Sequence, residues 1–170
     1  KLETDDGLHG WGESGLSGRE AAVMGALRHY RELLIGKDPF RIGAIWQDLY
    51  RSQYFEGGRV LVAAISAIDI ALHDLKGKAL GVPVYELLGG KHREFVPLFA
   101  TTSAPMGPRL IEDAHTLLDN GWNVIRTWMH APSETRHDGD PVYEPWESVG
   151  ETARWLNRLR EAVGDRAVLG

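Results

Sequence analysis

The longest regular pattern of apolar residues lies within residues 60–90. Its large apolar residues recur at spacings of three and four, the period of an α-helix with one apolar face: Leu61, Ile65, Ile68, Leu72 and Leu75. Alanines occupy other faces, so neighbouring elements can approach closely. The pattern predicts a long helix buried between its neighbours, then a Gly-Val-Pro break and a short second helix that ends at Gly89-Gly90.

Residues 1–59 combine a hairpin pattern with two shorter helical patterns. Residues 1–13 predict a β-hairpin that turns at Asp5-Asp6-Gly7. Residues 17–20 predict a capping box that opens one helix, and a second helix is predicted after Pro39. The apolar faces of these helices are formed by Val23, Leu27, Tyr30 and Leu34, and by Ile42, Ile45, Trp46, Leu49 and Tyr50. A small sheet followed by helices predicts an α+β domain over residues 1–90.

After residue 90 strands and helices alternate. Strands are predicted at residues 95–103, 123–128 and 167–169. One helix is predicted from Pro108 through Leu118, and a second opens at a capping box over residues 148–151. This order predicts parallel βαβ units, but a closed (β/α)8 barrel needs roughly 250 residues. We therefore predict an incomplete (β/α)8, or TIM-type, barrel over residues 91–170, in a chain that is a fragment of a longer protein.

Composition narrows the functional classes. The 170 residues are 43% hydrophobic, which is enough for a core, and no apolar run approaches the length of a membrane span. The net charge of −5, with both signs interspersed, argues against nucleic acid as the main partner. No cysteine is present, so a metal would need oxygen ligands or some of the seven histidines. With no signal peptide visible, we expect a cytoplasmic protein without a membrane partner.

The connection over residues 129–147 is much longer than the few residues that usually join a strand to a helix. It follows the C-terminal end of a parallel strand, the edge at which barrel enzymes build active sites. We predict a lid or pocket wall, with a surface or oligomer insertion as the alternative. Within this connection, His137, Asp138 and Asp140 are interpreted as a solvated charge cluster rather than as metal ligands.

Three stretches resemble one known family. They are Gly-Trp-Gly-Glu at residues 10–13, the segment ISAIDIALHDLKGKALGVPVYELLGG within residues 64–90, and residues 121–126 together with 159–164. The chain resembles the mandelate racemase/muconate lactonizing enzyme type of the enolase superfamily, nearest to its sugar-acid (mannonate and galactonate) dehydratase branches. The resemblance implies a capping domain on residues 1–90, over the mouth of the barrel, and a homo-oligomer. It also implies a Mg²⁺ cofactor, whose ligands are expected beyond Gly170, so no metal ligand is assigned in this chain.

The resemblance also directs attention to the end of the second barrel strand. Where the family usually has a Lys-x-Lys pair with the second lysine as base, this chain has Arg126, Thr127 and Trp128. Tryptophan cannot accept a proton, so a simple racemase is disfavoured. The arginine resembles the mannonate dehydratase branch, in which it works with a tyrosine of the following loop, here Tyr143. A fixed cation lowers the pKa of a neighbouring phenol. Alternatively, Arg126 binds a substrate carboxylate or pairs with an acidic neighbour, and Tyr143 only packs.

Other candidate residues surround this strand end. His130 is a candidate acid or base near neutral pH, or simply a solvated histidine. The predicted substrate-binding residues are the hydroxyls that end the first barrel strand, the tryptophan after Arg126, and two residues after the hairpin that otherwise form a plain turn: Thr101, Thr102, Ser103, Trp128, Ser14 and Leu16. Asp69 and His73 have ligand spacing on the long helix, but a structural role explains them better.

These observations lead to a functional hypothesis. We predict a Mg²⁺-dependent acid-sugar dehydratase, a lyase that removes the proton α to a carboxylate and eliminates water through an enediolate. One alternative is a racemase or cycloisomerase of the same superfamily. The other is a non-catalytic regulatory member, because the usual base is missing.

Overall fold

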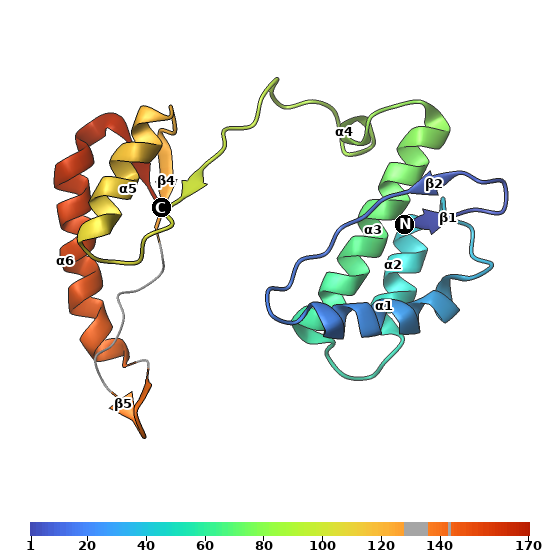
Figure 1. Cartoon of the computed structure of the whole chain (residues 1–170). Coiled ribbons are helices and arrows are strands. Elements are labelled where there is room, and N and C mark those ends of the chain that lie inside the picture. The colour runs from blue at the N-terminus through green and yellow to red at the C-terminus, as the bar shows by residue number, and fades with distance from the viewer. Residues whose placement is uncertain (128–135, 143) are drawn as a thin grey trace. The chain divides into compact units, whose positions relative to one another are not determined.

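The structure is a computed structural model that describes residues 1–127, 136–142 and 144–170, with only the backbone of Pro141 (Figure 1). The chain divides into two compact units, Lys1–Glu94 and Phe95–Gly170, each of which is considered by itself. None of the helices within the described ranges is long and apolar enough to cross a membrane.

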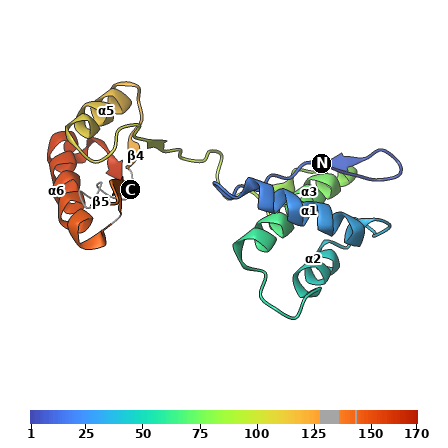
Figure 2. The same ribbon diagram turned by 60° about the horizontal axis from the view of Figure 1, so that its bottom comes forward.

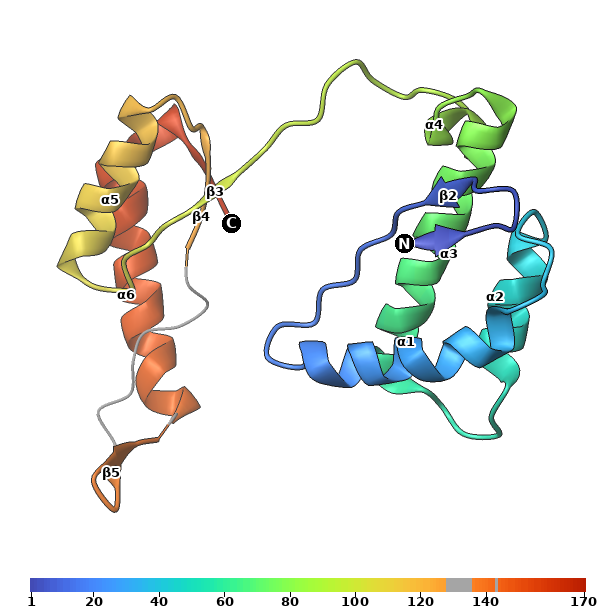
Figure 3. The same ribbon diagram turned by 45° about the vertical axis from the view of Figure 1, so that its right-hand side comes forward.

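The first unit is built around one long helix. Its elements are β1 (Leu2–Glu3), β2 (His9–Gly10), α1 (Glu20–Leu34), α2 (Ile42–Arg51), α3 (Gly58–Leu80) and α4 (Val84–Leu87). Figure 3 shows α1, α2 and the hairpin grouped around α3. The long helix, the break and the short helix are confirmed: α3 ends where Gly81 adopts a left-handed φ of 68° and its N–H bonds back to the carbonyls of Gly77 and Lys78.

The core of this unit joins the apolar faces of the three long helices. Buried residues of α1, α2 and α3 form one cluster, which includes Val23, Tyr30, Ile45, Leu49, Ile65, Ile68 and Leu72. The predicted faces are therefore confirmed except at Tyr50, which is exposed and stacks on Trp46 instead. Leu27, Leu34 and Trp46 pack at the margin. Burial raises the pKa of the Tyr30 hydroxyl above its ordinary value, because the charged phenolate is poorly solvated there.

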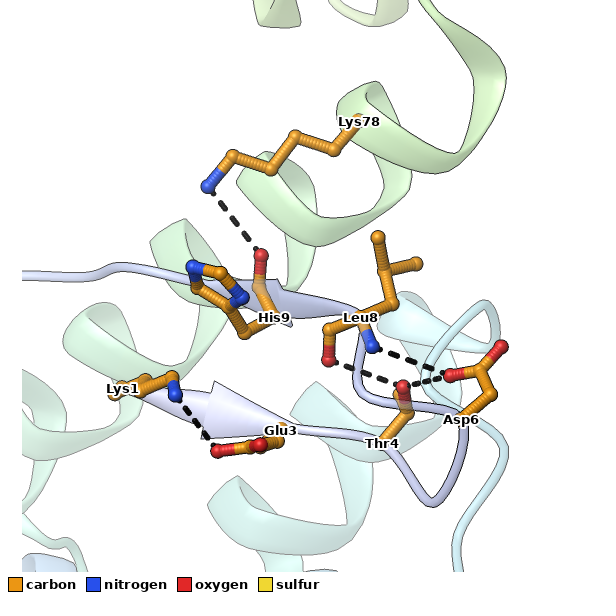
Figure 4. A network of polar contacts seen from close by, with 7 residues as sticks. All are labelled: Lys1, Glu3, Thr4, Asp6, Leu8, His9 and Lys78. Carbon is orange, nitrogen blue, oxygen red and sulfur yellow. Dashed lines mark hydrogen bonds and ion pairs between the residues drawn. The ribbon is translucent and has the colours of Figure 1, made fainter.

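The predicted hairpin is confirmed, with antiparallel pairs Leu2↔Gly10 and Glu3↔His9. Its turn is held by Thr4, whose backbone N–H donates to the Leu8 carbonyl at 2.9 Å and whose hydroxyl oxygen lies 3.0 Å from the same carbonyl (Figure 4). Asp6 accepts from the Thr4 hydroxyl and from the Leu8 N–H, and these bonds lower the pKa of its carboxyl. The side chain of Lys78 donates to the His9 carbonyl at 3.3 Å, which connects the hairpin to α3.

Strand β2 and the residues that follow it lie against the backbone of α3. A Cβ added to Gly10 would be 1.9 Å from the Ala71 carbonyl oxygen, and one added to Gly12 would be 1.9 Å from that of Ala67. Between them, the Trp11 N–H donates to the Asp74 carboxylate at 2.8 Å. The two glycines therefore permit an approach that no other residue type could make.

The stability that Asp74 contributes to the contact between the hairpin and α3 should depend on pH. Its carboxylate accepts from Lys78 at 2.6 Å and from Trp11, and these bonds lower the pKa of Asp74. Because the pKa is depressed in the folded state, the stabilisation is present above the ordinary Asp value of about 4 and is lost as the pH falls through the folded value. We expect Asp74→Asn to lower the free energy of unfolding by about 1 kcal/mol at neutral pH.

The difference between Asp74→Asn and the unchanged protein should shrink towards about pH 3, below the ordinary Asp pKa. Urea unfolding at both pH values measures it. The control is Asp48→Asn, because Asp48 forms an exposed pair with Lys37 at 2.5 Å, a kind of pair that contributes little. An equal loss for both variants, or a pH-independent loss for Asp74→Asn, would show that the ionised Asp74 carboxylate does not stabilise the fold through these bonds.

The second unit holds a three-stranded parallel sheet with the order β3-β4-β7. Its elements are β3 (Ala100–Thr101), α5 (Pro108–Asp119), β4 (Val124–Arg126), β5 (Arg136–His137), β6 (Asp140–Pro141), α6 (Pro145–Val163), a 3₁₀ turn (Gly164–Arg166) and β7 (Val168–Leu169). Figures 1 and 2 show α5 and α6 side by side. Ile125 of β4 is fully buried with Leu110 of α5 and Leu159 of α6, so the predicted βαβ units are confirmed.

Three local predictions are wrong. The strand predicted over residues 95–103 covers only Ala100–Thr101, because within the described chain only these residues pair with β4. The capping box at residues 17–20 does not form: α1 follows Arg19, and Glu20 instead accepts from the Gly18 N–H at 3.0 Å. The helix expected to open at Ser148 begins at Pro145, whose fixed φ suits a first helical position.

Candidate functional site

Two side chains meet at the C-terminal edge of the parallel sheet. Thr101 of β3 and Arg126 of β4 are register partners, so their side chains leave adjacent strands at the same level. Each is the last residue of its strand. This is the edge at which parallel α/β structures bind ligands, because the loops that follow the strands all begin there.

The Arg126 guanidinium has two neighbours there. Its Nε–H donates to the Thr101 hydroxyl at 3.1 Å, and its Cζ lies 4.7 Å from the centre of the Phe99 ring. The Arg126 carbonyl accepts from the Thr102 N–H at 2.9 Å, which fixes the backbone between β3 and β4. Both the arginine and Thr101 are exposed, so the charge can be reached from outside the sheet.

The other two predicted hydroxyls have structural partners. Thr102 is buried, with 2% of its surface exposed, and its hydroxyl lies 3.4 Å from the Ala104 carbonyl. The carboxylate of Asp113 on α5 accepts from the Ser103 N–H at 2.5 Å, the Ser103 hydroxyl at 3.1 Å and the Ala104 N–H at 3.1 Å. Thr101 is therefore the hydroxyl that lies beside the arginine, while the roles of Thr102 and Ser103 in substrate binding stay predictions.

Asp113 was not among the candidates from sequence. It holds the turn between β3 and α5, and so supports the strand end on which Thr101 lies. In the sequence Asp113 resembles an ordinary solvent-facing acidic residue of a helix, and it lies ten residues from its partner Ser103. Nothing in the spacing distinguishes it, so only the tertiary structure identifies it.

Three predicted residues lie outside the described residues: Trp128, His130 and Tyr143. Their proposed roles therefore stay predictions. Ser14 and Leu16 belong to the first unit, where Leu16 packs at the margin of the helical core. The Ser14 hydroxyl oxygen is buried and has no hydrogen-bond partner within the described part of the chain. Their part in substrate binding also stays a prediction.

The described residues contain no group of three or more histidine, aspartate or glutamate side chains that could hold a metal ion. His137 lies 3.2 Å from Asp138 with both side chains largely exposed, in agreement with a solvated charge cluster. His73 Nδ1 lies 2.9 Å from the Asp69 carbonyl and 3.3 Å from its carboxylate, a contact within one helix. The described residues therefore do not fit a Mg²⁺ site.

The family of the chain follows from its first unit. The model of the N-terminal domain of the mandelate racemase/muconate lactonizing enzyme family matches residues 1–89, more than half of the chain. The chain belongs to this family. The resemblance predicted from the sequence is therefore confirmed, as is the fold of a family capping domain followed by part of an α/β unit with parallel strands.

Relatives of this family member are named as dehydratases. D-galactonate dehydratase of Variovorax paradoxus is 47% identical over 126 residues, which are 74% of this chain and 33% of that protein. A D-galactonate dehydratase family member of Pseudarthrobacter chlorophenolicus is 44% identical in an alignment 177 positions long, which covers 94% of this chain and 43% of that protein. The chain thus spans less than half the length of the curated relatives it matches.

A solved structure agrees with this family assignment. An enolase from Pantoea ananatis, crystallised with bound D-gluconate and Mg, superimposes with a TM-score of 0.80 and 31% identity. The match covers 98% of this chain and 46% of that one. Both units of the chain therefore have counterparts in an enolase whose crystals hold a sugar acid.

Proposed function

We propose that the intact protein is an acid-sugar dehydratase. It removes the proton α to the carboxylate of an aldonic acid and expels the β-hydroxyl as water, leaving a 2-keto-3-deoxy acid. The observation that carries this proposal is Arg126 at the C-terminal end of β4, exposed and held beside Thr101. The names of the relatives, D-galactonate dehydratase in two organisms, support the same reaction class.

The chemistry explains why an arginine matters at this position. Removing the α-proton of a carboxylate places a second negative charge on the substrate as an enediolate, so nearby positive charge lowers the barrier. Arg126 can supply that charge to the carboxylate, or it can hold the predicted partner Tyr143 as a phenolate base. In either role a base, for which Tyr143 and His130 are the predicted candidates, takes the α-proton, and the C–H electrons form the enediolate. The β C–O bond then breaks as the leaving hydroxyl takes up a proton and departs as water, and the enol product becomes the ketone.

Dependence on Mg²⁺ is part of the proposal. It is supported by the enolase from Pantoea ananatis, which holds Mg together with D-gluconate. The position of the Mg²⁺ ligands, expected beyond Gly170, stays a prediction from the sequence. A cytoplasmic location and homo-oligomeric assembly also stay predictions from the sequence, as does the absence of nucleic-acid partners.

The alternatives differ in the product they release. A racemase or cycloisomerase would return an isomer and no water, and residue 128 is tryptophan where the family's racemases offer a lysine base. A regulatory member would bind an acid without changing it. Product analysis therefore distinguishes the dehydratase from both alternatives, whereas a binding measurement does not.

The test is a panel of aldonic acids, including D-galactonate and D-gluconate, incubated with the intact protein and Mg²⁺. We expect a 2-keto-3-deoxy acid from at least one of them, detected as its semicarbazone and by NMR, and loss of turnover on addition of a chelator. Incorporation of solvent deuterium at the α-carbon without elimination would indicate a racemase. Binding without either change would support the regulatory alternative.

A further inference from the structure

The Arg126 side chain is restrained from two directions. Phe99 and Thr101 are two residues apart, and both contact the same guanidinium. The ring contact, 4.7 Å from Cζ to the ring centre, restrains the position of the guanidinium above the ring. The bond from Nε to the Thr101 hydroxyl, at 3.1 Å, restrains its rotation.

This restraint has consequences for what the arginine can bind. A guanidinium presents five N–H donors in a planar fork, and a carboxylate or phenolate can bind through the edge formed by Nε and one Nη or through the edge formed by the two Nη groups. Because Nε already donates to the Thr101 hydroxyl, only the edge formed by the two Nη groups is available to an oxygen ligand. An exposed arginine otherwise distributes over many rotamers, with about 2 kcal/mol of side-chain entropy to lose on binding.

We infer that Phe99 and Thr101 are positioning residues for Arg126. Together they hold the guanidinium so that its two Nη groups point at the reacting acid or its base before the substrate arrives. Neither residue needs to touch the substrate. This inference rests on the proposed function, since it requires Arg126 to act in the reaction.

The structure argues against a role for Phe99 in strand packing alone. The sequence predicts it as a strand residue of the barrel, but it lies outside β3, and 51% of its surface is exposed. Phe95 is exposed to 73% in the same segment, and among the described residues it has no ring or cation contact like that of Phe99. The stack on Arg126 therefore distinguishes Phe99 from its neighbour.

Steady-state kinetics on the intact protein test the inference. Thr101→Val removes the acceptor with little change in volume, and Phe99→Leu removes the ring. We expect each to lower kcat or to raise KM by about tenfold, whichever of the two constants Arg126→Lys changes, because a displaced catalytic group loses rate steeply. Thr101→Ser and Phe99→Tyr, which keep the hydroxyl and the ring, should restore it to within about twofold.

Two controls and one double variant complete the design. Thr116→Val and Phe95→Leu make matched changes away from the arginine, and thermal unfolding of every variant reports on folding. In the Arg126→Lys background Thr101→Val should have no further effect, because no guanidinium Nε–H remains to be held. This result supports positioning.

Two outcomes overturn the inference while Arg126 keeps its role in the proposed reaction. One is that Arg126→Lys is slow but Thr101→Val and Phe99→Leu keep wild-type constants. The other is an equal further drop for Thr101→Val in the Arg126→Lys background, which would show that Thr101 contacts the substrate itself. If Arg126→Lys itself is fully active while an aldonic acid is still dehydrated, the inference fails because Arg126 has no role in an established reaction.

Discussion

Arg126→Met in the intact protein is expected to lower kcat by about 10²-fold to 10³-fold for the aldonic acid that the protein dehydrates. The variant should still fold. The side chain is exposed, and its bond to Thr101 joins two strands that also pair through the backbone. Its loss should therefore change the free energy of unfolding little. The catalytic loss should be large, because the positive charge is removed from the position at which negative charge develops.

The matched control is Arg158→Met. Arg158 is an exposed arginine on α6 whose Cζ lies 4.7 Å from the centre of the Trp155 ring, so the substitution removes the same charge and the same kind of ring contact. We expect kcat to stay within about twofold of wild type there. Measurement of kcat and KM for both variants, with thermal unfolding alongside, separates catalysis from folding. Equal rates for the two variants would exclude Arg126 from the reaction.

Tyr143→Phe distinguishes the two roles left open for the arginine. If Arg126 holds a phenolate base, Tyr143→Phe should be as slow as Arg126→Met, and the double variant should be no slower than either. If Arg126 binds the carboxylate, Tyr143→Phe should be nearly silent, while KM rises in Arg126→Met. The pair of measurements therefore assigns the role rather than only the involvement.

Elements set by local pattern were predictable from the sequence. The helix α3 follows from apolar residues at helical spacing, and it ends at the glycine of the Gly-Val-Pro break. The hairpin follows from Asp-Asp-Gly between two short extended segments. In each case the signal lies within a few residues of the feature it determines, so neighbouring parts of the fold are not needed to read it.

The wrong predictions have two causes: two local signals compete, or the feature depends on a neighbour elsewhere in the fold. Ser148 and Glu151 match a capping box, but Pro145 begins the helix three residues earlier, and Ser148 is buried inside it with its hydroxyl 3.3 Å from the Pro145 carbonyl. Residues 95–99 are apolar enough for a strand, yet a strand exists only where a neighbour pairs with it. Pairing is a tertiary property, and sequence pattern does not contain it.

The site was predictable in part for the same reason. Arg126 and Thr101 could be selected as the ends of adjacent parallel strands, because topology brings such ends to one edge. The contact between Arg126 and Phe99, and the three bonds of Asp113, depend on side-chain directions that no spacing rule provides. The supporting residues of the site therefore emerge only from the structure.

Gly12→Ala is expected to cause a large loss of stability in the first unit. The new Cβ would lie 1.9 Å from the Ala67 carbonyl oxygen and 2.9 Å from the Ala71 backbone nitrogen. Both obstacles are backbone atoms of α3, so no side chain can rotate away, and the strand must separate from the helix. We expect the free energy of unfolding to fall by about 3 kcal/mol or more, the upper range for overpacking.

Gly25→Ala is the matched control, because the same methyl group is added inside α1, where nothing lies within 4 Å. Alanine favours a helix over glycine by up to about 1 kcal/mol, so this variant should be slightly more stable. Gly10→Ala should resemble Gly12→Ala, and the double variant should lose less than the sum, because one separation of the strand from α3 relieves both clashes. Denaturant unfolding measures all four. A loss below about 1 kcal/mol for Gly12→Ala would show that the strand moves away from α3 at little cost, and that the two glycines do not determine how the hairpin packs.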